Sequence, residues 1–229
     1  LARSAKLAGE GDLAARFRKL QAKLEAEGLL DPSRKRPLPE LPRVVGVVTS
    51  KTGAALRDIM RVAHERCPVH ILVADCRVQG EHAPRSIVSA LELVQRVDDL
   101  DVVIVSRGGG SADYLRAFND EGVARAIAAC RVPVVSGVGH EVDITIADLV
   151  ADVRAATPSN AAEIVVPERE ALLGQLRSLE RGLSRALDNR IGGLRLVLER
   201  LLRPLYDARR VIAPVRSELA ELEAELSGA

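Results

Sequence analysis

Four runs of Val, Ile and other apolar residues, each followed by a polar loop and a helical pattern, set the strongest constraint on how this chain folds. The runs cover 43–50, 69–76, 101–105 and 132–138. Because they are nearly continuous in apolar residues, both faces of the predicted sheet are expected to be covered. Helical patterns follow at 52–66, 83–97, 119–130 and 144–153. The sequence therefore predicts an α/β fold over residues 44–166, with an open, mostly parallel sheet and helices on both faces.

Two segments of different character flank this predicted domain. Residues 1–43 contain a predicted helix over 12–28, closed by Gly28, and then a Pro-rich connector. The connector carries three basic residues at 34–36, which favours either a solvated linker or a patch that contacts a nucleic-acid backbone.

Residues 167–229 place Leu and Ile at steps of three and four, which predicts a long helical extension of coiled-coil character. Pro204 and Pro214 interrupt this run, so a single long helix and a helical hairpin are both open. In either form the narrow apolar stripe needs a partner. The segment is therefore interpreted as a docking element rather than a second globular domain.

Composition narrows the classes of partner. The formal net charge is +1, aromatic residues make up 2% of the chain and Trp is absent, so contact with a nucleic acid is expected mainly at its backbone. Three cysteines without a C-x-x-C pair favour reduced thiols in a cytoplasmic protein over a disulfide framework or zinc site. No apolar stretch approaches 18 residues, so no membrane partner is expected.

Polar, Gly-rich loops follow each predicted strand. Right-handed crossovers between parallel strands bring such loops to one edge of the sheet, where open α/β sheets bind ligands. A single site is therefore expected there. Its candidate phosphate-binding residues outside the glycine loop are Ser50, Thr52, Gly53, Thr157 and Ser159, and Asp58 lies on the helix that follows the first loop. Thr157 and Ser159 are also suited to cap a helix, with or without a phosphate.

The loop "RGGGSAD" (107–113) has three adjacent glycines, and it fits neither the G-x-x-x-x-G-K-[ST] nor the G-x-G-x-x-G phosphate-binding pattern. The amides of Gly108, Gly109 and Gly110 and the Ser111 hydroxyl are suited to approach an anion, and Arg107 to clamp two phosphate oxygens. The alternative is a tight turn with Arg107 as a surface cation.

The motif "GHEVD" (139–143) holds the candidate general base. If a helix begins at Glu141, then His140 and Asp143 share a face, and the carboxylate orients the imidazole. The alternative is a structural histidine at a strand end. Because H-E-x-x-H is absent, a zinc hydrolase is disfavoured.

Five motifs in order, "GVVTSKTGAALRDI", "RVQGEHA", "RGGGSADYLRAFNDE", "VPVVSGVGHEVDITIADLVAD" and "RAATPSNAAEIVVP", resemble the catalytic domain of the exodeoxyribonuclease VII large subunit. The resemblance covers about residues 10 to 167. It implies a nuclease that degrades single-stranded DNA to short oligonucleotides, with a helical tail that binds small subunits or, without them, pairs with itself. The family's amino-terminal OB-fold has no counterpart here, so the chain is expected to be a fragment. The resemblance carries catalytic roles to Asp58, Arg107, His140 and Asp143.

This chain departs from the family after "GGGS-x". A Glu–Asp pair is common there, whereas this chain has Asp113 and Tyr114. Two options for the site follow: Mg²⁺ held by Asp58 and Asp113, or metal-independent hydrolysis.

Two other functions are carried as alternatives, a non-catalytic assembly scaffold and a nucleotide- or sugar-phosphate-binding domain that uses the same glycine loop.

Overall fold

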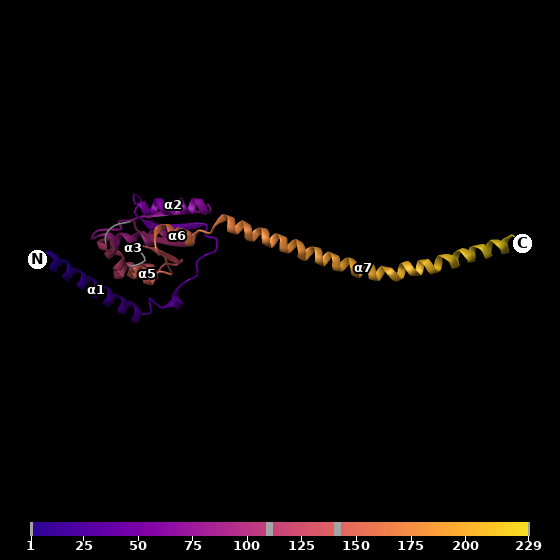
Figure 1. Ribbon diagram of the computed structural model, residues 1–229, viewed down its shortest axis with the longest axis horizontal. Helices are drawn as coiled ribbons and strands as arrows, with labels where there is room; N and C mark the ends of the chain where they lie inside the picture. The colour runs from indigo at the N-terminus through magenta and orange to yellow at the C-terminus, as the bar shows by residue number, and fades with distance from the viewer. Residues whose placement is uncertain (1, 109–111, 140–142, 229) are drawn as a thin grey trace. The chain divides into compact units, whose positions relative to one another are not determined.

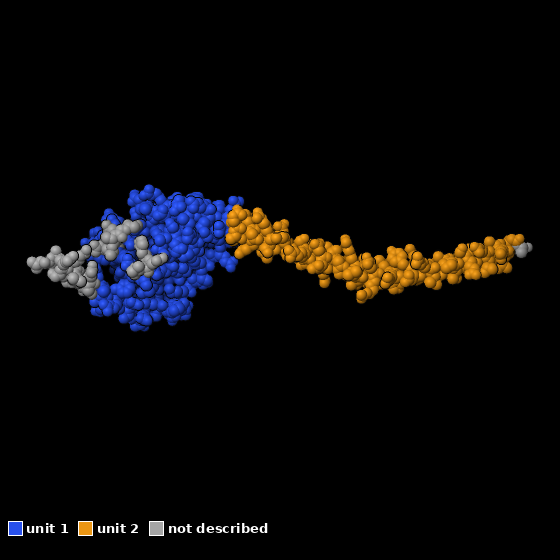
Figure 2. Space-filling model, in the orientation of Figure 1, with its two compact units in different colours: residues 1–169 blue, residues 170–229 orange. Residues whose placement is uncertain are grey.

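The computed structural model describes residues 2–108, 112–139 and 143–228 (Figure 1). The chain divides into two compact units, residues 1–169 and 170–229, which are coloured separately in Figure 2.

The first unit is built around a five-stranded sheet in the order β2-β1-β3-β4-β5, in which every neighbouring pair is parallel. The parallel sheet that the apolar runs predict is thus confirmed. The strands are β1 (Val44–Thr49), β2 (His70–Asp75), β3 (Val102–Ser106), β4 (Val134–Gly137) and β5 (Val153–Arg154).

Helices cover both faces of the sheet, as predicted. Alternate side chains of β3 enter different cores: Val103 and Val105 pack with α3 and α4, whereas Ile104 packs with α2 and α6. This alternation follows from the two-residue period of a strand. The helices that follow β1 in this unit are α2 (Ala54–Arg66), α3 (Ala83–Val94), 3-10 helix η2 (Ala112–Asn119), α4 (Glu121–Ala128), α5 (Ile146–Val150) and α6 (Pro158–Val165).

The helix predicted over 144–153 is wrong at both ends. Residues 143–145 are not helical, α5 ends at Val150, and Val153 pairs with Val135 in β5. Asp152 explains the early end, because its carboxylate accepts hydrogen bonds from the Val134 amide (2.7 Å) and from Arg36, and so ties the chain to the sheet edge.

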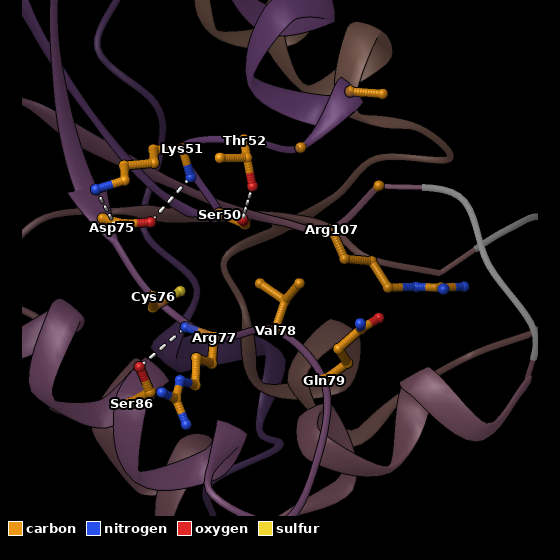
Figure 3. Close-up of a pocket in the computed structure, with 13 residues that line it drawn as sticks. Ser50, Lys51, Thr52, Asp75, Cys76, Arg77, Val78, Gln79, Ser86 and Arg107 are labelled. Carbon is orange, nitrogen blue, oxygen red and sulfur yellow. Dashed lines mark hydrogen bonds and ion pairs between the residues drawn. The ribbon is translucent and has the colours of Figure 1, made fainter.

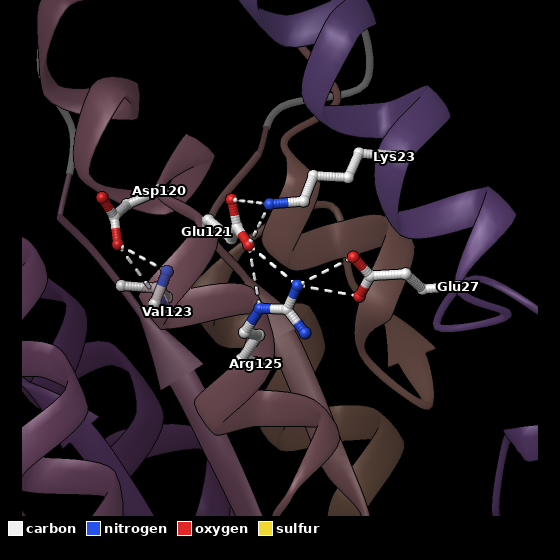
Figure 4. A network of polar contacts seen from close by, with 7 residues as sticks. Lys23, Glu27, Asp120, Glu121, Val123 and Arg125 are labelled. Atoms are coloured by element: carbon white, nitrogen blue, oxygen red, sulfur yellow. Dashed lines mark hydrogen bonds and ion pairs between the residues drawn. The ribbon is translucent and has the colours of Figure 1, made fainter.

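The amino-terminal helix α1 (Ala2–Ala26) packs against α4 and α5 through Leu24, which is fully buried beside Ala124 and Ile146. Figure 4 shows the ion pairs beside this contact, which join Lys23 to Glu121 and Glu27 to Arg125. Gly28 then turns the chain with φ of 73°.

The connector after Gly28 contains the 3-10 helix η1 (Pro32–Arg34) and is anchored by Arg36. Arg36 donates to the Asp152 carboxylate through its backbone amide (2.7 Å) and through its side chain (Nη2 at 2.8 Å). At least this part of the basic cluster is therefore held against the unit rather than being a solvated linker.

The second unit is the helix α7 (Arg169–Ser227), a single helix that continues through Pro204 and Pro214. The single-helix alternative is therefore the correct one. None of the described residues of α7 is buried, and its stripe of Leu and Ile, which runs from Leu176 to Leu226, is exposed. Within the described part of the chain, no helix combines the length and the apolar character needed to span a bilayer.

Candidate active site

The candidate site lies where β1 and β3 end side by side. β2 lies on one side of β1 and β3 lies on the other, so the order of the strands reverses at β1. Such a switch point opens a crevice outside the carboxyl ends of the strands, which is where open α/β sheets bind ligands. Two cavities open at this edge, and Arg107 and Gly108 line both of them.

The smaller cavity, of about 260 Å³, brings together residues that are far apart in the sequence. Asp58 comes from α2, Arg107 and Gly108 follow β3, and Thr157 and Ser159 lie at the start of α6. Asp58 is the one carboxylate among the described residues that line it. A predicted acid, a predicted cation and two predicted hydroxyls thus share one small space.

Arg107 is the most unusual side chain of this site. The residue is only 5% exposed, and its Nε donates to the Val138 carbonyl at 3.1 Å. Its Nη1 is buried without a hydrogen-bond partner among the described residues. Burial lowers the pKa of the guanidinium from its ordinary value, and the carboxylates of Asp143 and Asp148 oppose this shift. A buried cation with an unused donor is suited to bind an anion.

Two helices begin at the smaller cavity. The amino terminus of α2 has Gly53 as its N-cap, which supplies no side-chain hydrogen bond, and a Cβ added to Gly108 would lie 3.8 Å from the amides of Ala54 and Ala55. The amino terminus of α6 is capped by Thr157, whose hydroxyl accepts from the Asn160 amide at 3.0 Å. The capping role expected of Thr157 is therefore confirmed. Free amides and the helix dipole make such termini favourable for negative charge.

The loop between β4 and α5 is held by Asp148, which the sequence analysis did not select. Its buried carboxylate accepts from the Ser136 hydroxyl (2.6 Å) and from the Thr145 amide and hydroxyl (both 2.8 Å). Gly139 must lack a side chain, because a Cβ there would lie 2.3 Å from the Asp143 carbonyl oxygen. Gly139 and Asp143 therefore lie close together.

Asp143 is exposed and lies outside a helix. The prediction that one helix face carries both His140 and Asp143 is therefore wrong in its placement of Asp143. The carboxylate nevertheless acts on the pKa of Arg107, so it lies close enough to contribute charge to the site. His140, Gly109, Gly110 and Ser111 lie outside the described residues. Asp113 is placed by its backbone in η2. Within the described residues, no group of three or more His, Cys, Asp or Glu side chains is placed to hold a metal ion.

The larger cavity, of about 740 Å³, contains the predicted residues Ser50, Thr52 and Gly53. Figure 3 shows Ser50 and Thr52 on one side, Arg77 to Gln79 on the opposite side, and Arg107 between them. The Ser50 and Thr52 hydroxyls lie 3.2 Å apart within hydrogen-bond distance. Arg77 and Gln79 were not selected from the sequence, although the loop that carries them was expected at this edge.

Comparison with known proteins gives one consistent family. Residues 29–229 match the family model described as exonuclease VII, large subunit. Relatives named exodeoxyribonuclease 7 large subunit include the protein of Moorella thermoacetica, which is 53% identical over 195 residues (85% of this chain and 48% of that protein). The protein of Desulforudis audaxviator is 49% identical over 220 residues (95% and 54%), and that of Cronobacter sakazakii 54% over 182 residues (79% and 40%). The chain spans about half the length of these relatives.

Proposed function

This chain belongs to the exonuclease VII large-subunit family, and we propose that its α/β unit hydrolyses phosphodiester bonds of single-stranded DNA to short oligonucleotides. The observation that carries the proposal is the position of Arg107. Its Nη1 is buried without a hydrogen-bond partner among the described residues. Arg107 also lines a cavity to which the first residues of α2 and α6 contribute. These groups together suit the charge that develops on the oxygens of a phosphate under attack.

The proposed reaction is in-line attack of water on the phosphorus. His140 takes the proton from water, and Asp143 orients and charges the imidazole. Arg107, the amide of Gly108 and the amides at the start of α2 stabilise the phosphoryl oxygens. The Ser159 hydroxyl, together with Thr157, adds hydrogen bonds that position the phosphate.

Asp58 has two possible parts in this proposal. Mg²⁺ is commonly bound by one or two carboxylates together with substrate phosphates, and Asp58, alone or with Asp113, is a ligand of the right kind. Such an ion would neutralise charge on the phosphate. Without metal, Asp58 would instead orient Arg107 or water within the same cavity.

The test is cleavage of end-labelled single-stranded DNA by the purified chain, with and without a chelator. We expect short products from the wild type and from Arg96→Ala, an exposed arginine just after α3 at the opposite edge of the sheet. Arg107→Ala and His140→Ala should retain the fold by circular dichroism and lose cleavage. Wild-type rates in either variant would refute the proposed chemistry, and loss of cleavage with chelator would establish the metal requirement.

The exposed stripe of α7 is the proposed docking surface for exodeoxyribonuclease VII small subunits, or for a second copy of the chain when they are absent. Support comes from the exposure of its apolar residues, since a helix surface of this kind is normally covered. Light scattering of the chain alone and after addition of the small subunit tests this. A monomer that does not bind the small subunit would contradict it.

A further inference from the structure

We propose that the larger cavity is a subsite for the nucleotide next to the scissile phosphate, and that it holds this nucleotide by its sugar and phosphate rather than by its base. This inference rests on the proposed function and adds to it a second binding site, with Arg77 and Gln79 as its own contacts. The first ground is location. Arg107 and Gly108 form a wall common to both cavities, so a strand with one phosphate in the smaller cavity places its neighbouring nucleotide in the larger one.

Size assigns different occupants to the two cavities. Small-molecule sites usually have volumes of about 300 to 1,000 Å³. The larger cavity, at about 740 Å³, falls in this range, whereas the smaller, at about 260 Å³, falls below it. A phosphate group therefore suits the smaller cavity and a whole nucleotide suits the larger.

Charge indicates an anionic ligand. Among the described residues that line the larger cavity, Lys51, Arg77 and Arg107 are basic and Asp75 is the one acid. Asp75 is already engaged by Lys51, through the backbone amide (2.9 Å) and the ammonium group (3.5 Å). The two arginines therefore remain for the ligand.

Arg77 and Gln79 are available for new contacts. Within the described part of the chain, neither side chain makes a hydrogen bond or ion pair, although the Arg77 backbone amide is held by the Ser86 hydroxyl at 2.9 Å. Ser50 and Thr52, on the opposite wall, bond to one another and keep further hydrogen-bonding capacity. A sugar-phosphate in this cavity would lie between the hydroxyl wall and the loop that carries Arg77 and Gln79.

The walls offer little by which to identify a base. No aromatic residue is present among the described lining residues, and the apolar part is formed by Cys76, Val78 and Ala54. Burial, with a smaller effect of the Asp75 charge, raises the pKa of the Cys76 thiol to about 12, so this group is neutral. Without an aromatic side chain to stack on the base, the subsite should accept all four bases.

The direct test is titration of the chain with thymidine 5′-monophosphate, followed by NMR, for the wild type, Arg77→Ala, Arg77→Lys and the control Arg96→Ala. We expect about tenfold weaker binding for Arg77→Ala, partial recovery with Lys and no change for the control. The other three deoxynucleoside monophosphates should bind within about threefold of the first, since the sugar and phosphate that they share are the proposed contacts. Equal binding to Arg77→Ala and Arg96→Ala, or no binding to the wild type, would overturn the subsite.

A kinetic test separates this inference from the proposed function. On single-stranded DNA, Arg77→Ala should raise KM about tenfold and leave kcat within about twofold. The affinity of Arg77→Ala for single-stranded DNA should also depend less steeply on salt. The slope of log affinity against log salt concentration should be shallower by about 0.7, because one phosphate contact is lost. A wild type that cleaves DNA, with Arg77→Ala identical to Arg96→Ala in both measures, would reject the subsite alone. An inactive wild type that still binds the monophosphate through Arg77 would reject the nuclease proposal alone.

Discussion

The two units of this chain use the same aliphatic residues in opposite ways. In the α/β unit, Leu91 and Ile104 are fully buried between the sheet and its helices, whereas Leu179 in α7 is 72% exposed. The difference arises from pattern, because short β-branched runs form strands that helices cover, and leucines at steps of three and four form a stripe on one helix. The first unit buries its own core, whereas the second leaves its apolar stripe exposed.

The two units also have different proposed roles. Every residue proposed for chemistry lies in the α/β unit, in a loop or at a helix start that the sheet positions. The proposed contacts with other subunits lie on α7. Changes in one unit should therefore affect cleavage or folding, and changes in the other should affect assembly.

The largest effect is expected from Arg107→Ala. Loss of a positioned guanidinium from a phosphoryl-transfer site lowers the rate by roughly 10³-fold or more. We expect this loss in kcat for single-stranded DNA. Thermal stability should fall modestly, because the substitution also removes the buried hydrogen bond from Arg107 Nε to the Val138 carbonyl. Leu187→Ala in α7, measured beside it, should cleave normally; equal losses in the two variants would show that the proposed separation of roles is wrong.

Replacing one leucine by alanine in each unit tests the difference in packing between them. Leu91→Ala leaves a cavity in the core and should lower the free energy of unfolding of the α/β unit by about 3 kcal/mol. Leu187→Ala, at a position that is 56% exposed, should change it by less than about 0.5 kcal/mol. Chemical denaturation followed by far-UV circular dichroism measures both changes in the free energy of unfolding. Similar values would mean that the α7 stripe packs on a core of its own.

Asp152→Asn, which removes a charge paired with Arg36, should lower the free energy of unfolding by a smaller amount, about 2 kcal/mol. Burial raises the pKa of Asp152, but hydrogen bonds from Arg36 and the Val134 amide outweigh it, so the net pKa lies below the ordinary value of 3.8. The pair therefore stabilises the fold above about pH 4 and loses its effect as the pH falls through the lowered pKa. Unfolding curves between neutral and acidic pH should show the two proteins converging in acid. A constant difference at every pH would contradict the charge-based explanation.

The smallest effect is expected from Lys23→Ala, which breaks an ion pair with Glu121 on the surface beside α1. Hydrogen bonds from Lys23 and Arg125 lower the pKa of Glu121, yet exposed pairs of this kind contribute little to stability. We expect no change in melting temperature beyond experimental error, because buried Leu24 is what fixes α1. A shift as large as that of Asp152→Asn would show that the charges position the helix.

Much of the fold could be predicted from the sequence because local pattern determines it. The four long strands follow from their β-branched runs, and the sheet edge that carries the site follows from parallel pairing. The two-residue strand β5 could not be found in this way, since it is too short to show a period and depends on Asp152 reaching Val134. Nor could α7 be separated from a hairpin while Pro204 and Pro214 counted as helix breaks.

The site was predictable as a set of loops but not as a geometry. Asp58, Arg107 and Thr157 could be selected as polar residues near strand ends, and the structure brings them to one cavity. Asp148 was missed because its role depends on Ser136, which is twelve residues away in sequence and adjacent only in the fold. Arg77 was missed for a similar reason, since only the shared wall at Arg107 connects its loop to the smaller cavity.

The most direct test of the proposed site is a crystal structure of the chain with a short single-stranded DNA that carries a non-hydrolysable phosphorothioate linkage. We expect one backbone phosphate in the smaller cavity, within hydrogen-bond distance of Arg107 Nη1 and of the amides that begin α2. A strand bound elsewhere, with Arg107 Nη1 still unpartnered and the smaller cavity without a phosphate, would contradict the assignment of this edge of the sheet as the active site.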